Sequence, residues 1–333
     1  MHQQTFSRGV SDSLRGVMQV GIMLSHLSYT SAEPALLFTL ANKFGTSIIA
    51  LYFFISGYGL MQSVRAGRGV GHLGKRLWGI FKPMLFITLM FGVYQIFYGS
   101  GYSAQWLSQL VWQGRTPLPN SWFVFVLMWL YISFWLAFRY LQRRRTPALI
   151  ILLLLSVVGV IWCQVQGHER AWWATTLAFF SGSLYAEYES KIYRYAKRWW
   201  ALALALLFVA SLVVADIEYL LPLAYLVIPV VAIVLMNRLG YAAWIDREGG
   251  KSGEPKTSIG AQIDQGIRQL MAYLARISYE LYLVHGVLII VFRGDLIYIC
   301  SDYTYALAVV VGSILVADLL HGLFHLKLRP RQA

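Results

Sequence analysis

Long apolar segments, separated by short polar ones, run through almost the whole chain. A helix that crosses a membrane needs about 20 mostly apolar residues, within a range of about 17 to 25. Segments of about this length lie at 14–30, 44–64, 80–98, 121–138, 148–165, 173–187, 199–215, 218–236, 277–293 and 303–325. Because lipid offers the backbone no hydrogen-bond partner, each span must be a helix, and the pattern predicts an all-α bundle of ten transmembrane helices.

Residues 237–276 form the one long polar segment, and its Gly, Ser, Pro and mixed charges predict a loop. A surface helix is expected within it, from Ala261 to Ala275. No internal or inverted repeat is visible in the sequence, which weakens a transporter interpretation. We therefore expect a single transmembrane domain over 1–333, with a cytoplasmic loop at 237–276 and no appended soluble domain.

Composition and charge support a membrane protein. Soluble domains carry about 25% charged residues, whereas this chain has 13%, with 58% hydrophobic residues. A net charge of +13 would suggest nucleic acid in a soluble protein, but here the basic residues gather in alternate loops. With both termini in the cytoplasm, all of the Lys and Arg residues except four face the cytoplasm, as the positive-inside rule requires. The exceptions are Lys43, Arg115, Arg170 and Arg293.

The first apolar segment carries two residues of chemical interest, Arg15 and His26. They are eleven residues apart, so about 100° per residue brings both to one helix face, with His26 about 16 Å along the axis from Arg15. An ionisable residue at that depth in a membrane is costly, so a functional histidine is the first hypothesis. The alternative is a neutral imidazole that only packs against a neighbouring helix.

The D-x-x-R-G segment (Asp12 to Gly16) followed by His26 resembles the R-x10-H motif of the acyltransferase-3 family. Four further segments resemble family motifs in the expected order: Phe53-Phe54-x-Ser56-Gly57, the basic run with Lys75, Arg76 and Pro83, the pair Trp122-Phe123, and Ser278-Tyr279-x-x-Tyr282-x-x-His285. The sequence departs from the family at Gly79, where a second arginine is common, and at Leu328-Arg329-Pro330, where many members have Glu-x-Pro.

This resemblance implies transfer of an acyl group, usually acetyl, from cytoplasmic acetyl-CoA or another acyl-CoA to a hydroxyl outside the cytoplasm. The implied acceptor is a cell-envelope polysaccharide or a lipid-linked glycan, and the implied location is the bacterial inner membrane. The expected partners are the acyl-CoA, the glycan acceptor, the lipid bilayer and an envelope polysaccharide synthesis complex, with no nucleic acid. No resident cofactor beyond the acyl-CoA co-substrate is expected, and no metal.

Each candidate residue has a functional and a structural interpretation. His26 is the expected general base, because imidazole titrates near neutral pH; an acyl-imidazole intermediate is the other route. Arg15 is expected to bind the phosphates of coenzyme A bidentately, and otherwise anchors its helix at the cytoplasmic side. Lys75 and Arg76 would line the basic donor entrance or simply determine topology.

The remaining candidates are assigned to the substrate side. His285 is expected to line the acceptor or acyl path, or else to be a hydrogen-bonded packing residue. Tyr282 and Trp122 follow from the resemblance alone. Ser56, with Gly57, is also placed there, although small residues more often permit close helix packing.

Two smaller patterns concern ions and cysteines. Glu280 follows Arg276 by four residues, which predicts an ion pair. Asp318, His321 and His325 share a helix face at a spacing that could hold a metal, but a polar patch is the interpretation we favour. Cys163 and Cys300 are the only cysteines, and the sequence leaves open whether they pair.

A transporter or flippase for a lipid-linked glycan is the main alternative function, with His26 as a proton-coupling residue. A scaffold subunit of a polysaccharide machine fits the hydropathy pattern but gives His26 no role. Labelled acyl-CoA discriminates between these classes, because only an enzyme consumes it.

Overall fold

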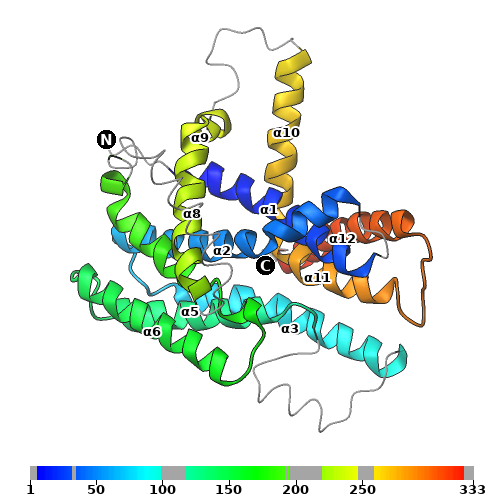
Figure 1. Cartoon of the computed structure of the whole chain (residues 1–333), viewed down its shortest axis with the longest axis horizontal. Coiled ribbons are helices and arrows are strands. Elements are labelled where there is room, and N and C mark those ends of the chain that lie inside the picture. The colour runs from blue at the N-terminus through cyan, green and yellow to red at the C-terminus, as the bar shows by residue number, and fades with distance from the viewer. Residues whose placement is uncertain are drawn as a thin grey trace, which may run out of the picture. The chain divides into compact units, whose positions relative to one another are not determined.

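The computed structural model of the chain describes residues 6–31, 35–98, 118–192, 194, 220–246 and 259–325, and the described residues form helices joined by turns and loops, without a strand (Figure 1). The helices are α1 (Arg8–Thr30), α2 (Leu36–Arg65), α3 (Leu73–Tyr98), α5 (Trp122–Phe138), α6 (Arg145–Val165), α8 (Leu221–Arg238), α9 (Tyr241–Ile245), α10 (Ile259–Arg276), α11 (Ser278–Val291) and α12 (Asp302–His325), with a 3₁₀ turn at Arg170–Trp172. Residues 177–192 form a further helix. The all-α prediction is confirmed for these residues.

Most of the predicted segments correspond to a helix, but several helices begin earlier than their apolar segments. Helix α1 begins at Arg8 rather than at 14, α2 at Leu36 rather than at 44, and α3 at Leu73 rather than at 80. The first turns of α1 and α3 carry basic residues and are helical although they are not apolar enough to be buried in lipid. The first turn of α2 is apolar, and Asn42 and Lys43 separate it from the predicted segment. The surface helix predicted at Ala261–Ala275 is confirmed as α10, and the predicted segment 199–215 lies outside the described residues.

Five described helices are long and apolar enough to cross a membrane: α2, α3, α6, α8 and α12. The bent pair α10 and α11 would make a sixth, and α5 is a shorter apolar helix. Helix α1 is not among them, and its polar residues, which include Asp12, Arg15, Gln19 and His26, lower its mean hydropathy. The predicted count of ten spans and the cytoplasmic placement of both termini therefore remain predictions.

The chain forms two compact units. The first contains Met1–Ser11, Phe44–Trp78 and Phe123–Arg268, and the second contains Asp12–Lys43, Gly79–Trp122 and Gln269–Ala333.

Close packing in the first unit depends on two glycines. A Cβ atom on Gly57 of α2 would overlap the carbonyl oxygen of Phe179, and one on Gly182 would overlap that of Phe54. The Ser183 hydroxyl also donates a hydrogen bond to the Gly57 carbonyl, at 3.2 Å. The packing role that we weighed for the Ser-Gly segment is thus confirmed for Gly57, since small residues let helix backbones approach in membranes.

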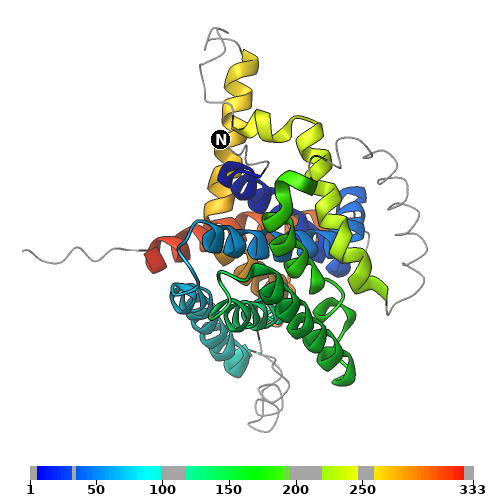
Figure 2. The same cartoon turned by 90° about the vertical axis from the view of Figure 1, so that its left-hand side faces the viewer.

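In the second unit, α1, α11 and α12 share one apolar core, and both views show α11 beside α12 (Figures 1 and 2). Leu27, Ile289, Tyr305 and Val309 are buried together there. The Tyr305 hydroxyl lies 3.1 Å from the Ile289 carbonyl oxygen and 3.2 Å from Thr30 Oγ1. Tyr305 therefore ties the three helices together with hydrogen bonds as well as with apolar contact.

A sharp bend separates α10 from α11 at Ile277, where the axes of 260–276 and 278–291 differ by 73°. The predicted pair of Arg276 with Glu280 is wrong, because the bend removes the two residues from a common helix face. Arg276 instead contacts Asp318 of α12 at 3.0 Å. Glu280 approaches His321 at 3.3 Å. Both cysteines are free, Cys163 buried and Cys300 exposed.

Candidate active site

Two histidines face each other inside the second unit. His26 lies on α1 and His285 on α11, and Nδ1 of His26 is 2.8 Å from Nε2 of His285. The two rings are nearly parallel, with 12° between their planes. His285 is completely buried, whereas His26 is partly exposed. The packed core around Leu27 and Ile289 holds the two helices in this arrangement.

A backbone carbonyl determines which nitrogens of the pair carry protons. Nδ1 of His285 lies 3.1 Å from the carbonyl oxygen of Leu281, which can only accept, so that Nδ1 carries the proton. In the neutral ring, Nε2 of His285 is then the acceptor, and Nδ1 of His26 must donate to it. Nε2 of His26 is consequently left with its lone pair. The pair therefore leaves His26 ready to accept a proton or to attack a carbon atom.

Asn120 is the third polar residue of this group, and its amide nitrogen is placed 3.3 Å from Nδ1 of His26. An amide can be turned to present its oxygen, and with Nδ1 of His26 protonated the oxygen is the favourable neighbour. Asn120 has a φ of +61°, in the left-handed region that asparagine tolerates better than most residues. Its carbonyl accepts a hydrogen bond from the Tyr282 hydroxyl.

Gly286 allows this turn to approach α11. A Cβ atom on Gly286 would lie 3.0 Å from the Asn120 amide nitrogen and 3.0 Å from the Pro119 side chain. Neighbours at that distance would have to shift. Because Gly286 has no side chain, Asn120 can lie close to the histidine pair.

Arg15 lies on α1, eleven residues before His26, and the continuous helix confirms that both residues belong to one element. Nη1 of Arg15 is 3.5 Å from the Asp12 carboxylate, and both side chains are 40% exposed. Asp12 therefore contacts Arg15. Gly16 packs against α10, where an added Cβ atom would lie 2.5 Å from the Met271 carbonyl oxygen. The glycine of the D-x-x-R-G segment thus holds α1 against α10 beside Arg15.

The predicted site residues divide between the two units. His26, Arg15, His285, Tyr282 and Trp122 all belong to the second unit, where the structure joins His26 to His285 and Tyr282 to Asn120. Trp122 is half-buried at the start of α5.

The other three candidates, Ser56, Lys75 and Arg76, belong to the first unit. Ser56 is half-buried, Lys75 and Arg76 are exposed, and Arg76 donates a hydrogen bond to Ser63 at 3.2 Å. Their assignment to the donor or to the substrate remains a prediction.

Asn120 is the residue that sequence reasoning missed. It opens the Asn-Ser-Trp-Phe segment, in which we singled out only the Trp-Phe pair. The signal that would have identified it is weak, because an asparagine before a helix is usually a cap or a turn residue.

A family model described as an acyltransferase domain matches residues 10–322, which is nearly the whole chain and includes every residue of the candidate active site. No curated protein and no solved structure matches the chain.

Proposed function

The chain belongs to the acyltransferase-3 family, and from that premise we propose that it transfers an acetyl group from cytoplasmic acetyl-CoA to a glycan hydroxyl outside the cytoplasm. The family match and the apolar helices together indicate a multi-pass membrane protein with acyltransferase activity. The proposed location is the bacterial inner membrane, and the proposed acceptor is a polysaccharide or a lipid-linked glycan.

The observation that carries this proposal is the contact of 2.8 Å between His26 and His285. An imidazole that only packs has no need of a second imidazole to orient it. Here the Leu281 carbonyl orients His285, and His285 in turn orients His26. A base held by a second group, which is itself held, is the arrangement that activates a hydroxyl in many unrelated enzymes.

In the proposed reaction Nε2 of His26 takes the proton of the acceptor hydroxyl. The hydroxyl oxygen forms a bond to the thioester carbonyl carbon, and the carbon–sulfur bond breaks. The proton on His26 then passes to the departing thiolate, so the products are an ester and free coenzyme A. During this transfer His26 is positively charged, and its Nδ1–H bond to His285 becomes charge-assisted and stronger.

Arg15 is the proposed binding residue for the donor phosphates. It is separated from His26 by about 16 Å of helix, so an extended donor would place its anionic end and its thioester at different depths. Its side chain is 40% exposed, so a ligand can reach it. A guanidinium presents a planar fork of donors that matches two phosphate oxygens.

The acceptor side is proposed around the Asn120 turn. The Tyr282 hydroxyl donates a hydrogen bond to the Asn120 carbonyl. Trp122 follows Asn120 by two residues in the sequence. Aromatic side chains with a polar edge suit a sugar that has apolar faces and hydroxyl edges.

Acetyl-CoA labelled in the acetyl group tests the proposal. The purified protein, reconstituted in lipid, is expected to release free coenzyme A and to transfer label to a glycan fraction, whereas the His26→Gln variant is not. Label that crosses the bilayer or stays on the thioester would favour a carrier. Label that remains on His26 after removal of the acceptor would show the acyl-imidazole route.

A further inference from the structure

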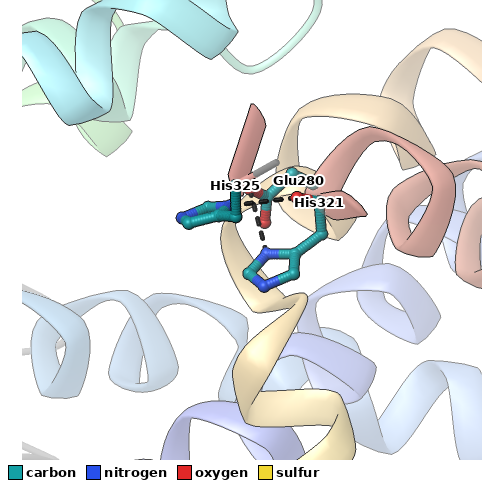
Figure 3. Close-up of side chains that lie close together, drawn as sticks. All are labelled: Glu280, His321 and His325. Carbon is teal, nitrogen blue, oxygen red and sulfur yellow. Dashed lines mark hydrogen bonds and ion pairs between the residues drawn. The ribbon is translucent and has the colours of Figure 1, made fainter. Parts of the chain in front are cut away.

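A second cluster of ionisable side chains lies between α11 and α12, at the carboxyl-terminal end of α12 (Figure 3). Glu280 stands in the first turn of α11, and His321 and His325 stand one turn apart on α12. The Glu280 carboxylate is buried, with 3% of the residue exposed, His321 is half-buried and His325 is exposed. The protein therefore shields the cluster from solvent at Glu280, and the cluster is accessible at His325.

The geometry fits a metal ion. One ligand atom from each of the three side chains lies within 4.8 Å of the other two. Zinc binds these atoms at about 2.0–2.2 Å with tetrahedral angles, so two of its ligands lie about 3.3–3.5 Å apart. The Glu280 oxygen and Nδ1 of His321 are 3.3 Å apart, and modest side-chain rotation would bring His325 to the same range.

The buried polar atoms of the cluster are incompletely satisfied among the described residues. A buried carboxylate needs a positive partner or several hydrogen bonds, and the Glu280 carboxylate contacts Nδ1 of His321 at 3.3 Å. Nδ1 of His321 is itself buried and makes no hydrogen bond within the part of the chain that the structure describes. A divalent cation would satisfy both atoms at once.

Contacts with neighbouring groups hold the two histidine ligands in place and keep Asp318 away from the proposed ion. Asp318, which the sequence pattern offered as the third ligand, is held by Arg276 at 3.0 Å. The rings of His321 and His325 stack with centroids 4.1 Å apart, and Nδ1 of His325 lies 3.0 Å from the His321 carbonyl oxygen. These contacts keep the two rings together on one side of Glu280.

We propose that Glu280, His321 and His325 bind a divalent transition metal of the zinc class, with a fourth position open to water or to a ligand. Two histidines and one carboxylate are a ligand set of zinc sites that keep such a position. The ion would join the start of α11 to the end of α12. His285 follows Glu280 by five residues on α11, so the metal would fix the helix that carries the second histidine of the candidate active site.

The test is metal binding by the full-length protein in detergent, purified with an affinity tag that contains no histidine. The protein is stripped with chelator, equilibrated with zinc and freed of excess. Elemental analysis should then give one zinc per chain. Cobalt should give the visible absorption of a tetrahedral site, and zinc should raise the melting temperature.

The matched variants are His325→Asn, which changes an exposed side chain, and Glu280→Gln, which removes the buried charge. Both should lose the bound zinc and its effect on the melting temperature while eluting from a sizing column as the wild type does. Asp318→Asn and His72→Asn, which alter an acid and a histidine outside the ligand set, should keep one zinc per chain. Wild-type protein without zinc, or His325→Asn protein with the full amount, would overturn the proposal.

Discussion

Replacing His285 by leucine should slow acyl transfer without preventing the protein from folding. The side chain is completely buried, and leucine fills a similar space without a polar atom. The change removes Nε2 of His285, which lies 2.8 Å from Nδ1 of His26 and accepts the hydrogen bond from it. His26 would then be free to carry its proton on Nε2, the nitrogen that the proposed reaction needs unprotonated.

The size of the effect follows from the change in charge during the reaction. A hydrogen bond between neutral groups contributes about 0.5–1.5 kcal/mol and one to a charged group about 1.5–3 kcal/mol. The bond to His285 passes from the first kind to the second when His26 takes a proton, a gain of about 1–1.5 kcal/mol, or about tenfold in rate. Loss of the correct tautomer adds to this, so we expect kcat to fall by about 10- to 100-fold.

The assay is the initial rate of transfer from labelled acetyl-CoA, measured on reconstituted variants at matched amounts. The KM for acetyl-CoA should be unchanged, because His285 is proposed to act on the base and not on the donor. His285→Gln supplies the matched control, since its amide oxygen can accept the same proton, and it should remain within a few-fold of wild type. A His285→Leu protein that keeps wild-type kcat would refute the orienting role.

Three further predictions concern the base, the donor and the packing. His26→Gln cannot take a proton near neutral pH and should lose about 10²- to 10⁴-fold in acyl transfer; activity within a few-fold of wild type would end its catalytic role. Arg15→Ala should weaken acetyl-CoA binding in a filter or calorimetric assay, and Arg15→Lys should restore little because it lacks the fork; equal affinities would remove the donor role. Gly57→Ala should lower the free energy of unfolding by about 1–3 kcal/mol through overpacking, measured by thermal denaturation. Gly59→Ala, where a Cβ atom meets nothing within 4 Å, should not, and equal losses in both would contradict the packing explanation.

The helices could be predicted from the sequence because apolar length is a direct signal of a span, but their ends could not. Arg8 and Leu36 begin helices well before the predicted segments, since hydropathy reports where lipid contacts the chain and not where the backbone stops being helical. The bend at Ile277 has no proline or glycine beside it to announce it. That bend is why Glu280 approaches His321 and not Arg276.

The two histidines of the candidate active site were each recognisable as ionisable residues in apolar segments. Their pairing was not, because His26 and His285 are 259 residues apart and no local pattern encodes a contact over that distance. The protons of the pair depend on the Leu281 carbonyl, a backbone atom whose position only the helix geometry gives.

Asn120 combines two requirements that few residues meet together. Its left-handed backbone costs most L-residues about 1–2 kcal/mol, with glycine, asparagine and aspartate as the exceptions. Its contact with His26 requires a short neutral amide. Glycine satisfies the first requirement alone, glutamine has the amide but is one methylene longer and lacks the backbone preference, and aspartate brings a charge into an apolar setting. In a saturation library selected for acetylated glycan, position 120 should therefore retain asparagine almost alone. Positions 122 and 282, which carry Trp122 and Tyr282, should tolerate more residue types.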